Sequence, residues 1–170
     1  SVTVLEGESL GRYIRPAGLD FAEGDVLLSR GTMLGPCELA LAAAMNHATL
    51  PVTRRPRIAL LATGDELVKP GEALGPDQIV TSNTYAVGAY AQAAGADIID
   101  LGIAGDTFAA IEAGIRAARD AGADVLVTLG GASVGDHDLV QTALANEGME
   151  LGFWKIAMRP GKPLMHGRIG

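Results

Sequence analysis

The sequence predicts an α/β fold, in which a mostly parallel sheet carries helices on both faces and so forms three layers. From about residue 56 onward, short apolar runs alternate with stretches of helical length, which is the pattern of repeated strand–helix–strand units. The apolar runs lack polar alternation, as expected of strands that are buried on both faces. The chain is 48% hydrophobic but only 4% aromatic, so small aliphatic side chains must fill the core.

The elements of this α/β domain, predicted over residues 56–170, follow one another in regular order. Strands are predicted at 57–62, 97–103, 124–130 and 151–158, and helices at 82–96, 107–123 and 137–148. Ser82 or Asn83 would cap the first of these helices, and Gly95 would end it. Asp106 or Thr107 would cap the second helix.

Residues 1–55 form a different, less regular part of the chain. The segment 25–35 is predicted to form a strand, a turn at Arg30-Gly31 and a second extended piece. Residues 36–48 are predicted to form a short helix, with Pro36 at its first position and Glu38 in its first turn. Large apolar residues are too few for an independent core, so we expect a linker or part of an elongated domain.

Composition limits the classes of partner. The formal net charge of −7 argues against non-specific binding to nucleic acid or to an anionic membrane. The single cysteine, Cys37, can form no internal disulfide, which favours a reducing cytoplasm, and its apolar surroundings predict a buried structural thiol. Neither a signal peptide nor an apolar run of membrane-spanning length is present in the sequence.

Acidic residues follow three of the predicted strands, where open α/β sheets bind their ligands. Asp65 and Glu66 come after the first strand, Asp106 after the second, and Asp136 and Asp138 after the third. Because the carboxyl ends of parallel strands share one edge of the sheet, we expect these acids to meet there. Carboxylates so arranged could bind Mg²⁺, which takes few protein ligands and keeps several waters.

The third strand ends at Gly130-Gly131. Glycines let a ligand approach the backbone, and the following helix directs free N–H groups toward the same space, which favours a phosphate. The loop matches no ATP-binding or dinucleotide-binding motif. Alternatively, the glycines only turn the chain and Asp136 or Asp138 only caps the helix. Ser133 has no triad partners that would indicate a hydrolase.

A basic turn follows the last predicted strand. Lys155, Arg159 and Lys162 lie around Pro160-Gly161 in an otherwise acidic chain. Cationic side chains at a stiff turn suit an oxyanion, although a solvated surface turn is the alternative. The three histidines have no common spacing and no cysteine partner, which argues against a zinc site of the His/Cys type.

Five motifs together resemble the molybdopterin molybdenumtransferase family, which includes MoeA and the gephyrin E-domain. They are TGDELVKPGE (63–72), SNTYAV (82–87), GIAGDT (102–107), LGGASVGDHD (129–138) and FWKIAMRPGKPL (153–164). Residues 14–34 resemble the stretch that precedes the molybdopterin-binding domain in that family. The resemblance implies that residues 56–170 are this domain, truncated at its C-terminus, and that residues 1–55 belong to an incomplete elongated domain.

The resemblance also implies a reaction and its residues. Family members take adenylylated molybdopterin and molybdate, insert molybdenum with the help of Mg²⁺, and release AMP. The implied catalytic residues are Glu66, Asp106, Asp138, Lys155, Arg159 and Lys162, of which Glu66, Asp106 and Asp138 would hold the metal. The implied binding residues are Thr63, Gly64, Asp65, Ser82, Asn83, Gly130, Gly131, Ser133, Gly135, Asp136, Pro160 and Gly161.

The resemblance leaves two other functions open. A molybdopterin adenylyltransferase has the same domain fold and a similar glycine loop, but residues 1–55 and the RPGKP turn fit the molybdenumtransferase better. A non-catalytic scaffold module is the other alternative. Arg159 replaces a common lysine and Thr81 a frequent aspartate. Implied partners are a second copy of the chain, in a homodimer, and a molybdopterin adenylyltransferase, with no nucleic acid and no membrane.

Overall fold

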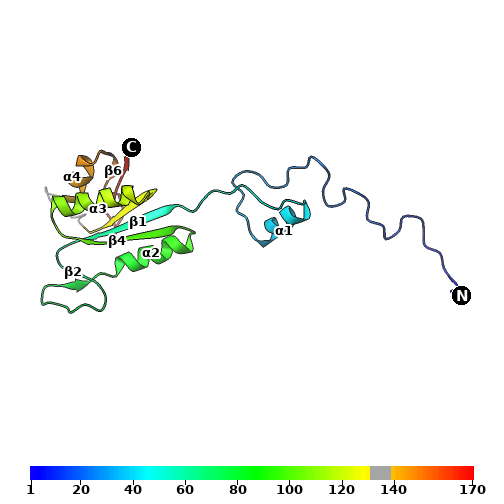
Figure 1. Ribbon diagram of the computed structural model, residues 1–170, viewed down its shortest axis with the longest axis horizontal. Helices are drawn as coiled ribbons and strands as arrows, with labels where there is room; N and C mark the ends of the chain where they lie inside the picture. The colour runs from blue at the N-terminus through cyan, green and yellow to red at the C-terminus, as the bar shows by residue number, and fades with distance from the viewer. Residues whose placement is uncertain (131–138) are drawn as a thin grey trace. The chain divides into compact units, whose positions relative to one another are not determined.

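A computed structural model describes residues 1–130 and 139–170 of the chain (Figure 1). The chain divides into two compact units, Ser1–Val52 and Thr53–Gly170. The second unit contains the sheet and the helices that cover it. In the part of the chain that the structure describes, no helix is long and apolar enough to cross a membrane.

The central sheet has three parallel strands: β1 (Arg57–Thr63), β4 (Asp97–Ala104) and β5 (Val125–Leu129). Their order is β4-β1-β5, so β1 lies in the middle. A middle strand under helices is buried on both faces, and β1 is buried from Ala59 to Thr63. The predicted parallel α/β sheet is therefore confirmed.

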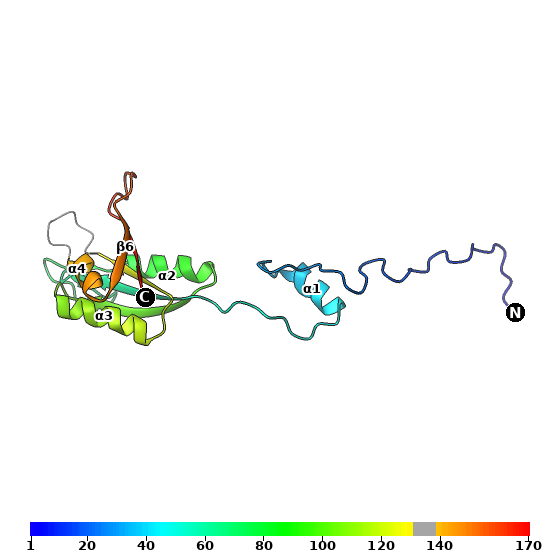
Figure 2. The same ribbon diagram turned by 90° about the horizontal axis from the view of Figure 1, so that it is seen from above.

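Helices cover both faces of this sheet because successive side chains of β1 point to opposite faces. Leu60 faces α2 (Asn83–Ala93), where a Cβ at Gly88 would lie 3.3 Å from its Cδ1. Leu61 faces α3 (Phe108–Asp120), where a Cβ at Gly114 would lie 2.6 Å from its Cδ2. The two helices therefore lie on opposite sides of the sheet (Figure 1, Figure 2), which makes the predicted three layers.

The main core lies between β1, α3 and α4 (Leu139–Asn146). Leu61, Ile111, Ile115 and Val140 pack together there, each exposed by 2% or less. Full burial of one such side chain contributes roughly 1.5–3 kcal/mol to the free energy of unfolding. This core holds the start of α3, which follows β4 directly, against the carboxyl end of β1.

The helix ends agree with the sequence signals. Thr107 caps α3 through its side chain, which accepts a hydrogen bond of 3.3 Å from the amide of Ala110. The chain therefore uses Thr107 and not Asp106 as the cap. Ser82 is the N-cap residue of α2, without a side-chain hydrogen bond. Gly95 follows the end of α2 with φ +93°, a conformation that glycine adopts readily.

The last predicted strand does not join the parallel sheet. Strand β6 (Met149–Trp154) pairs antiparallel with β7 (Met165–Ile169) in a separate two-stranded sheet. The prediction of a strand over 151–158 was wrong at its end, because Lys155 has φ +71° and turns the chain after Trp154. The short parallel pair β2 (Leu67–Val68) and β3 (Ile79–Val80) was not predicted.

The first unit contains the helix α1 (Pro36–Ala44), which begins at the predicted proline. The carboxylate of Glu38 accepts a hydrogen bond of 2.9 Å from the amide of Gly35 and so satisfies one free donor at this helix end. Among residues 1–52, all of which are described, Ala42 alone is buried.

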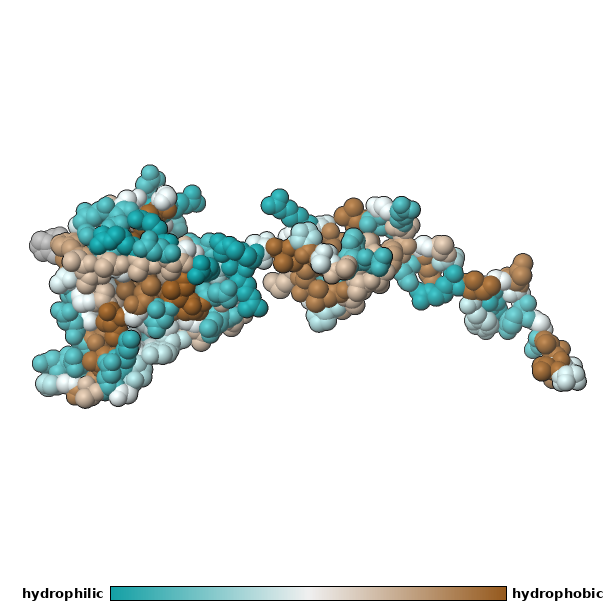
Figure 3. Space-filling view, in the orientation of Figure 1, coloured by the Kyte–Doolittle hydropathy of each residue, from teal (hydrophilic) through white to brown (hydrophobic). Residues whose placement is uncertain are grey.

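Two predictions for this unit were wrong. Residues 25–35 contain the turn at Arg30-Gly31 but no strand, since no segment pairs with them. Cys37 is exposed and not buried, because α1 buries only one alanine. Large apolar side chains are exposed along the whole unit, including Val2, Leu10 and Met33, and Figure 3 shows brown patches between teal ones in this part of the chain.

Candidate functional site

The carboxyl ends of the three parallel strands meet at one edge of the sheet. Thr63, the last residue of β1, is paired with Ala104, and Ala62 is paired with Leu129 on the other side. The loops that begin at Gly64, Gly105 and Gly130 therefore start side by side. Two of these loops carry the acids Asp65, Glu66 and Asp106, while the rest of the third loop, 131–138, lies outside the described residues.

Asp65 and Asp106 hold each other's backbone. The amide of Asp106 donates a hydrogen bond of 3.1 Å to Oδ1 of Asp65. The amide of Asp65 in turn donates to Oδ2 of Asp106 at 3.4 Å, which is long for an N–H···O bond. The amide of Gly64 donates to the carbonyl of Ala104 at 3.2 Å. These bonds fix the first loop beside the second.

Glu66 is exposed, and its side chain folds back over Gly64. A Cβ at Gly64 would lie 2.5 Å from Oε2 of Glu66, and the backbone there has φ +145°. A residue with a side chain would meet both the steric clash and the backbone strain. Because an exposed glutamate side chain can move aside, the positive φ is the stronger reason for glycine at this position.

Thr63 has an unpartnered hydroxyl at the same edge. The residue is only 3% exposed, and among the described residues its Oγ1 has no hydrogen-bond partner. The hydroxyl faces Gly130, where a Cβ would lie 2.9 Å from it. Because burying an unpaired hydroxyl costs free energy, such a group commonly binds a water, an ion or a ligand.

Ser82 and Asn83 lie where α2 begins. The helix of a strand–helix–strand unit runs antiparallel to its strands, so α2 begins at the carboxyl edge of the sheet. Both side chains are exposed. In the described part of the chain, neither forms a hydrogen bond with Glu66 or Asp106, so their predicted binding role rests on their place at this edge.

The basic residues lie on the hairpin that joins β6 to β7, which projects from the body of the second unit in Figure 2. Lys155, Arg159 and Lys162 are exposed, as are Pro160 and Gly161 between them. Backbone bonds close the base of the turn, among them one of 2.8 Å from the amide of Lys155 to the carbonyl of Leu164. Within the described residues, the three cations form no ion pair, so their charge is available to an anion.

Lys155 has one further contact. Its Nζ lies 4.2 Å from the centroid of the Trp154 ring, a distance at which the ring attracts a cation. Among the described residues, no hydrogen bond or ion pair joins this hairpin to Glu66 or Asp106.

The predicted metal-binding set is only partly described. Among the described residues, no three His, Cys, Asp or Glu side chains lie close enough together to hold an ion. Glu66 and Asp106 lie on neighbouring loops, whereas Asp138 lies outside the described residues. Gly131, Ser133, Gly135 and Asp136 also lie outside them. The metal-binding and glycine-loop assignments stay predictions.

The opposite edge of the sheet contains an ion pair between Arg54 and Asp124. The carboxylate of Asp124 accepts hydrogen bonds from Arg54 at 2.6 Å and from the amide of Arg57 at 2.8 Å. The hydrogen bonds from Arg54, and next from Arg57, lower the pKa of Asp124 to about 2. This ion pair fixes the start of β1 against the start of β5 and is remote from the acidic edge.

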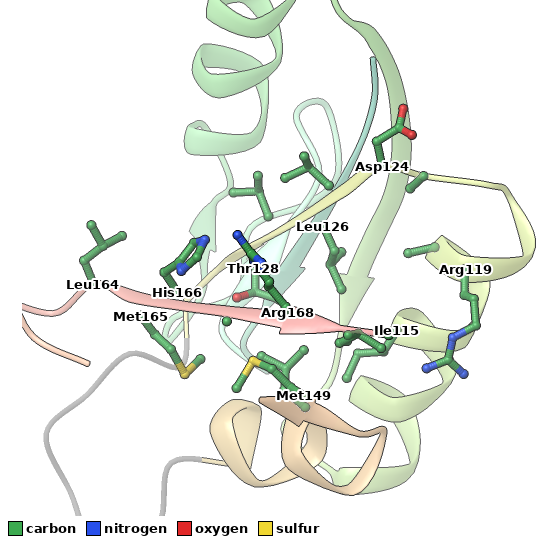
Figure 4. Close-up of a pocket in the computed structure, with 18 residues that line it drawn as sticks. Ile115, Arg119, Asp124, Leu126, Thr128, Met149, Leu164, Met165, His166 and Arg168 are labelled. Carbon is green, nitrogen blue, oxygen red and sulfur yellow. The ribbon is translucent and has the colours of Figure 1, made fainter. Parts of the chain in front are cut away.

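A cavity of about 740 Å³ lies elsewhere in the described residues. It follows β5 and β7, and Figure 4 shows Leu126 of β5, Ile115 of α3 and Met149 of β6 around it. Strand β5 is hydrogen-bonded to β1 on one side only, so this cavity borders its free edge. No residue predicted for the site lines it.

Comparison with known proteins identifies relatives of the second unit and of the whole chain. A family described as a probable molybdopterin binding domain matches residues 59–170. A molybdopterin molybdenumtransferase of Haemophilus influenzae is 36% identical over 169 residues, which are 99% of this chain and 41% of the relative. A molybdopterin molybdenumtransferase of Nostoc is 40% identical over 163 residues, 96% of this chain and 37% of that relative.

Solved structures show the same fold. The crystal structure of a molybdopterin biosynthesis moea protein from Pyrococcus horikosii has a TM-score of 0.75 and 34% sequence identity to this chain. It covers 89% of this chain, and the match spans 37% of that protein. The chain therefore spans about two fifths of the length of the relatives that it matches.

Proposed function

Because this chain belongs to the molybdopterin-binding domain family, we propose that it supplies the molybdopterin-binding part of a molybdopterin molybdenumtransferase. The proposed reaction takes adenylylated molybdopterin and molybdate, inserts molybdenum into the pterin dithiolene and releases AMP. The names of the relatives support this choice. The observation that carries it is the edge of the sheet at which the buried Thr63 hydroxyl, Glu66 and Asp106 lie on adjacent strand ends.

The polar groups of this edge suit a substrate with a phosphate. The Thr63 hydroxyl lacks a partner among the described residues and lies against Gly130, so a ligand oxygen that reached it would satisfy a buried donor. Glycine at 64 and at 130 keeps the backbone free of side chains. We assign Thr63, Gly64, Gly130 and Gly131 to substrate binding, together with Ser82, Asn83, Ser133, Gly135 and Asp136.

An acidic edge needs a cation before it can hold a phosphate. We propose that Glu66, Asp106 and Asp138 hold Mg²⁺, which would neutralise phosphate charge when bound. Two exposed carboxylates on neighbouring loops fit this ion, because Mg²⁺ commonly takes one or two protein carboxylates and keeps several waters. The carboxylates of Glu66 and Asp106 would hold the ion at the edge of the sheet where Thr63 ends β1.

The basic hairpin suits the second anion. Lys155, Arg159 and Lys162 are exposed and form no ion pair within the described residues, so they would attract molybdate or a released phosphate group. Pro160 and Gly161 shape the turn between them. In this proposal the two anionic substrates bind different groups, the pterin phosphate at the sheet edge and molybdate at the hairpin.

Partners are part of the same proposal. The exposed apolar side chains of residues 1–52 support contact with a second copy, in a homodimer. A molybdopterin adenylyltransferase would supply the adenylylated substrate in the cytoplasm. The chain spans about two fifths of the length of its relatives, so substrate binding and turnover have to be measured separately.

The test measures AMP release and pterin binding together. The chain receives adenylylated molybdopterin, molybdate and Mg²⁺ in one arm, and molybdopterin, ATP and Mg²⁺ in the other. AMP release that depends on molybdate supports the molybdenumtransferase, whereas adenylylation in the second arm supports the related adenylyltransferase. Pterin binding without either reaction would indicate a binding module, and absence of pterin binding would overturn the proposal.

A further inference from the structure

The loops after β1 and β4 are tied together by their own aspartates. Oδ1 of Asp65 accepts the amide hydrogen of Asp106 at 3.1 Å, and Oδ2 of Asp106 is 3.4 Å from the amide nitrogen of Asp65. The first bond lies within the usual range and the second beyond it. The carboxylate of Asp65 is therefore the stronger acceptor of the pair.

Gly105 permits this approach. A Cβ at position 105 would lie 2.9 Å from Oδ1 of Asp65, closer than real Cβ contacts allow. The Asp65 carboxylate thus lies against the backbone of the neighbouring loop, and its Oδ1 accepts a hydrogen bond from that backbone. The backbone bond of 3.2 Å from Gly64 to Ala104 lies beside it, so the end of β1 and the start of the second loop form one unit.

This unit determines where a proposed metal-binding carboxylate lies. Asp106 follows Gly105 directly and precedes Thr107, the cap of α3, while Glu66 follows Asp65. Fixing the amide of Asp106 therefore fixes its loop relative to Glu66. The buried hydroxyl of Thr63, two residues before Asp65, has no hydrogen-bond partner among the described residues, which independently supports a ligand at this edge.

We propose that Asp65 is a positioning residue, whose carboxylate holds the Asp106 loop beside Glu66 by accepting a hydrogen bond. Its negative charge is not required for this role. The inference rests on the proposed function only for the identity of the ligand. It differs from the role that the family resemblance implied, since Asp65 acts through Asp106 and not on the ligand.

Two substitutions distinguish the role of Asp65 as a hydrogen-bond acceptor from the role of its negative charge. Asp65→Asn keeps an oxygen that can accept the Asp106 amide but removes the charge, and Asp65→Ala removes both. We expect hydrogen exchange of the Asp106 amide to stay within about twofold of the original protein in Asp65→Asn and to become about fivefold faster in Asp65→Ala. Dissociation constants for molybdopterin, measured by anaerobic fluorescence titration with Mg²⁺, should follow the same pattern.

Asp77→Ala is the matched control, because Asp77 is exposed and has no hydrogen bond among the described residues. It should change neither the exchange rate of the Asp106 amide nor the dissociation constant for molybdopterin. Equal loss of pterin binding in Asp65→Asn and Asp65→Ala would overturn the proposal, because the charge would then matter. Unchanged exchange of the Asp106 amide in Asp65→Ala would also overturn it. This exchange measurement needs no ligand, so it decides the role of Asp65 even if molybdopterin does not bind and the proposed function fails.

Discussion

The backbone of Gly130 passes directly against Thr63. A Cβ at position 130 would lie 2.3 Å from the carbonyl oxygen of Thr63 and 2.9 Å from its hydroxyl, and φ at Gly130 is +113°. The end of β5 thus lies against the end of β1, where Thr63 is buried and its hydroxyl faces Gly130. Thr63 and Gly130 thus pack the sheet together and also belong to the proposed binding site.

Gly130→Ala should therefore destabilise the fold strongly. The added methyl group would overlap backbone atoms that cannot move independently, and the positive φ adds strain, so we expect a loss of about 2–4 kcal/mol in the free energy of unfolding. Gly148→Ala is the control, because φ there is +89° but no atom lies within 4 Å of the added Cβ. Urea denaturation measures both, and an equal loss in the two variants would show that contact with Thr63 contributes nothing.

Substitution of Thr63 should affect stability and binding in opposite directions. Thr63→Val removes a hydroxyl that has no partner among the described residues and keeps the branched shape, so the free energy of unfolding should rise by about 1 kcal/mol. Affinity for molybdopterin should fall about fivefold, because the ligand loses a hydrogen bond. Thr63→Ser should show the reverse: weaker folding through the lost methyl group but retained binding. Calorimetric unfolding and pterin titration test this, and unchanged binding in Thr63→Val would exclude the hydroxyl from the site.

The proposed metal-binding acids should matter for turnover. Glu66→Gln and Asp138→Ala should each lower molybdate-dependent AMP release by about 100-fold or more, since lost stabilisation of developing charge has effects of this size. Unfolding temperatures should change little for Glu66→Gln, because Glu66 is exposed. Glu150→Gln, an exposed acid on β6, is the control. Metal insertion that survives both substitutions would show that the site lies elsewhere.

The ion pair at the other edge predicts a pH dependence. Hydrogen bonds from Arg54 and Arg57 lower the pKa of Asp124 from 3.8 to about 2 in the folded chain, so folding favours the ionised form. The stabilisation is complete above about pH 4 and is lost as the pH falls toward 2. Between pH 4 and pH 2, the unfolding temperature should therefore fall less in Asp124→Asn than in the original protein. Asp120→Asn, at an exposed aspartate, is the control: its unfolding temperature should fall with pH as steeply as that of the original protein.

The order of strands and helices could be predicted because each signal is local. Apolar runs without alternation marked β1, β4 and β5, and the helix signals at Pro36, Thr107 and Gly95 lie within one turn of the residues that they affect. Strands of two residues, such as β2 and β3, carry no period and were missed. The antiparallel pairing of β6 was missed because nothing in its sequence specifies the partner β7.

Errors in the first unit have the same origin. Whether Cys37 is buried, and whether residues 25–35 form a strand, depends on which segments pack against them. The sequence indicated an apolar helix and a β-like run, but α1 buries only Ala42 and residues 25–35 pair with no other strand. Intrinsic preference is a weak determinant where such contacts are missing.

By itself, the sequence determined the fold class and the edge that carries the acids, because hydrophobic period and strand direction follow from neighbouring residues. Only the tertiary structure decided that β1 lies between β4 and β5, that Thr63 is buried against Gly130, and that Asp65 accepts the amide of Asp106. Each of these contacts joins residues that are far apart in the chain. They form only when the whole sheet assembles under its helices, since a long-range contact depends on the packing of every element between its two partners.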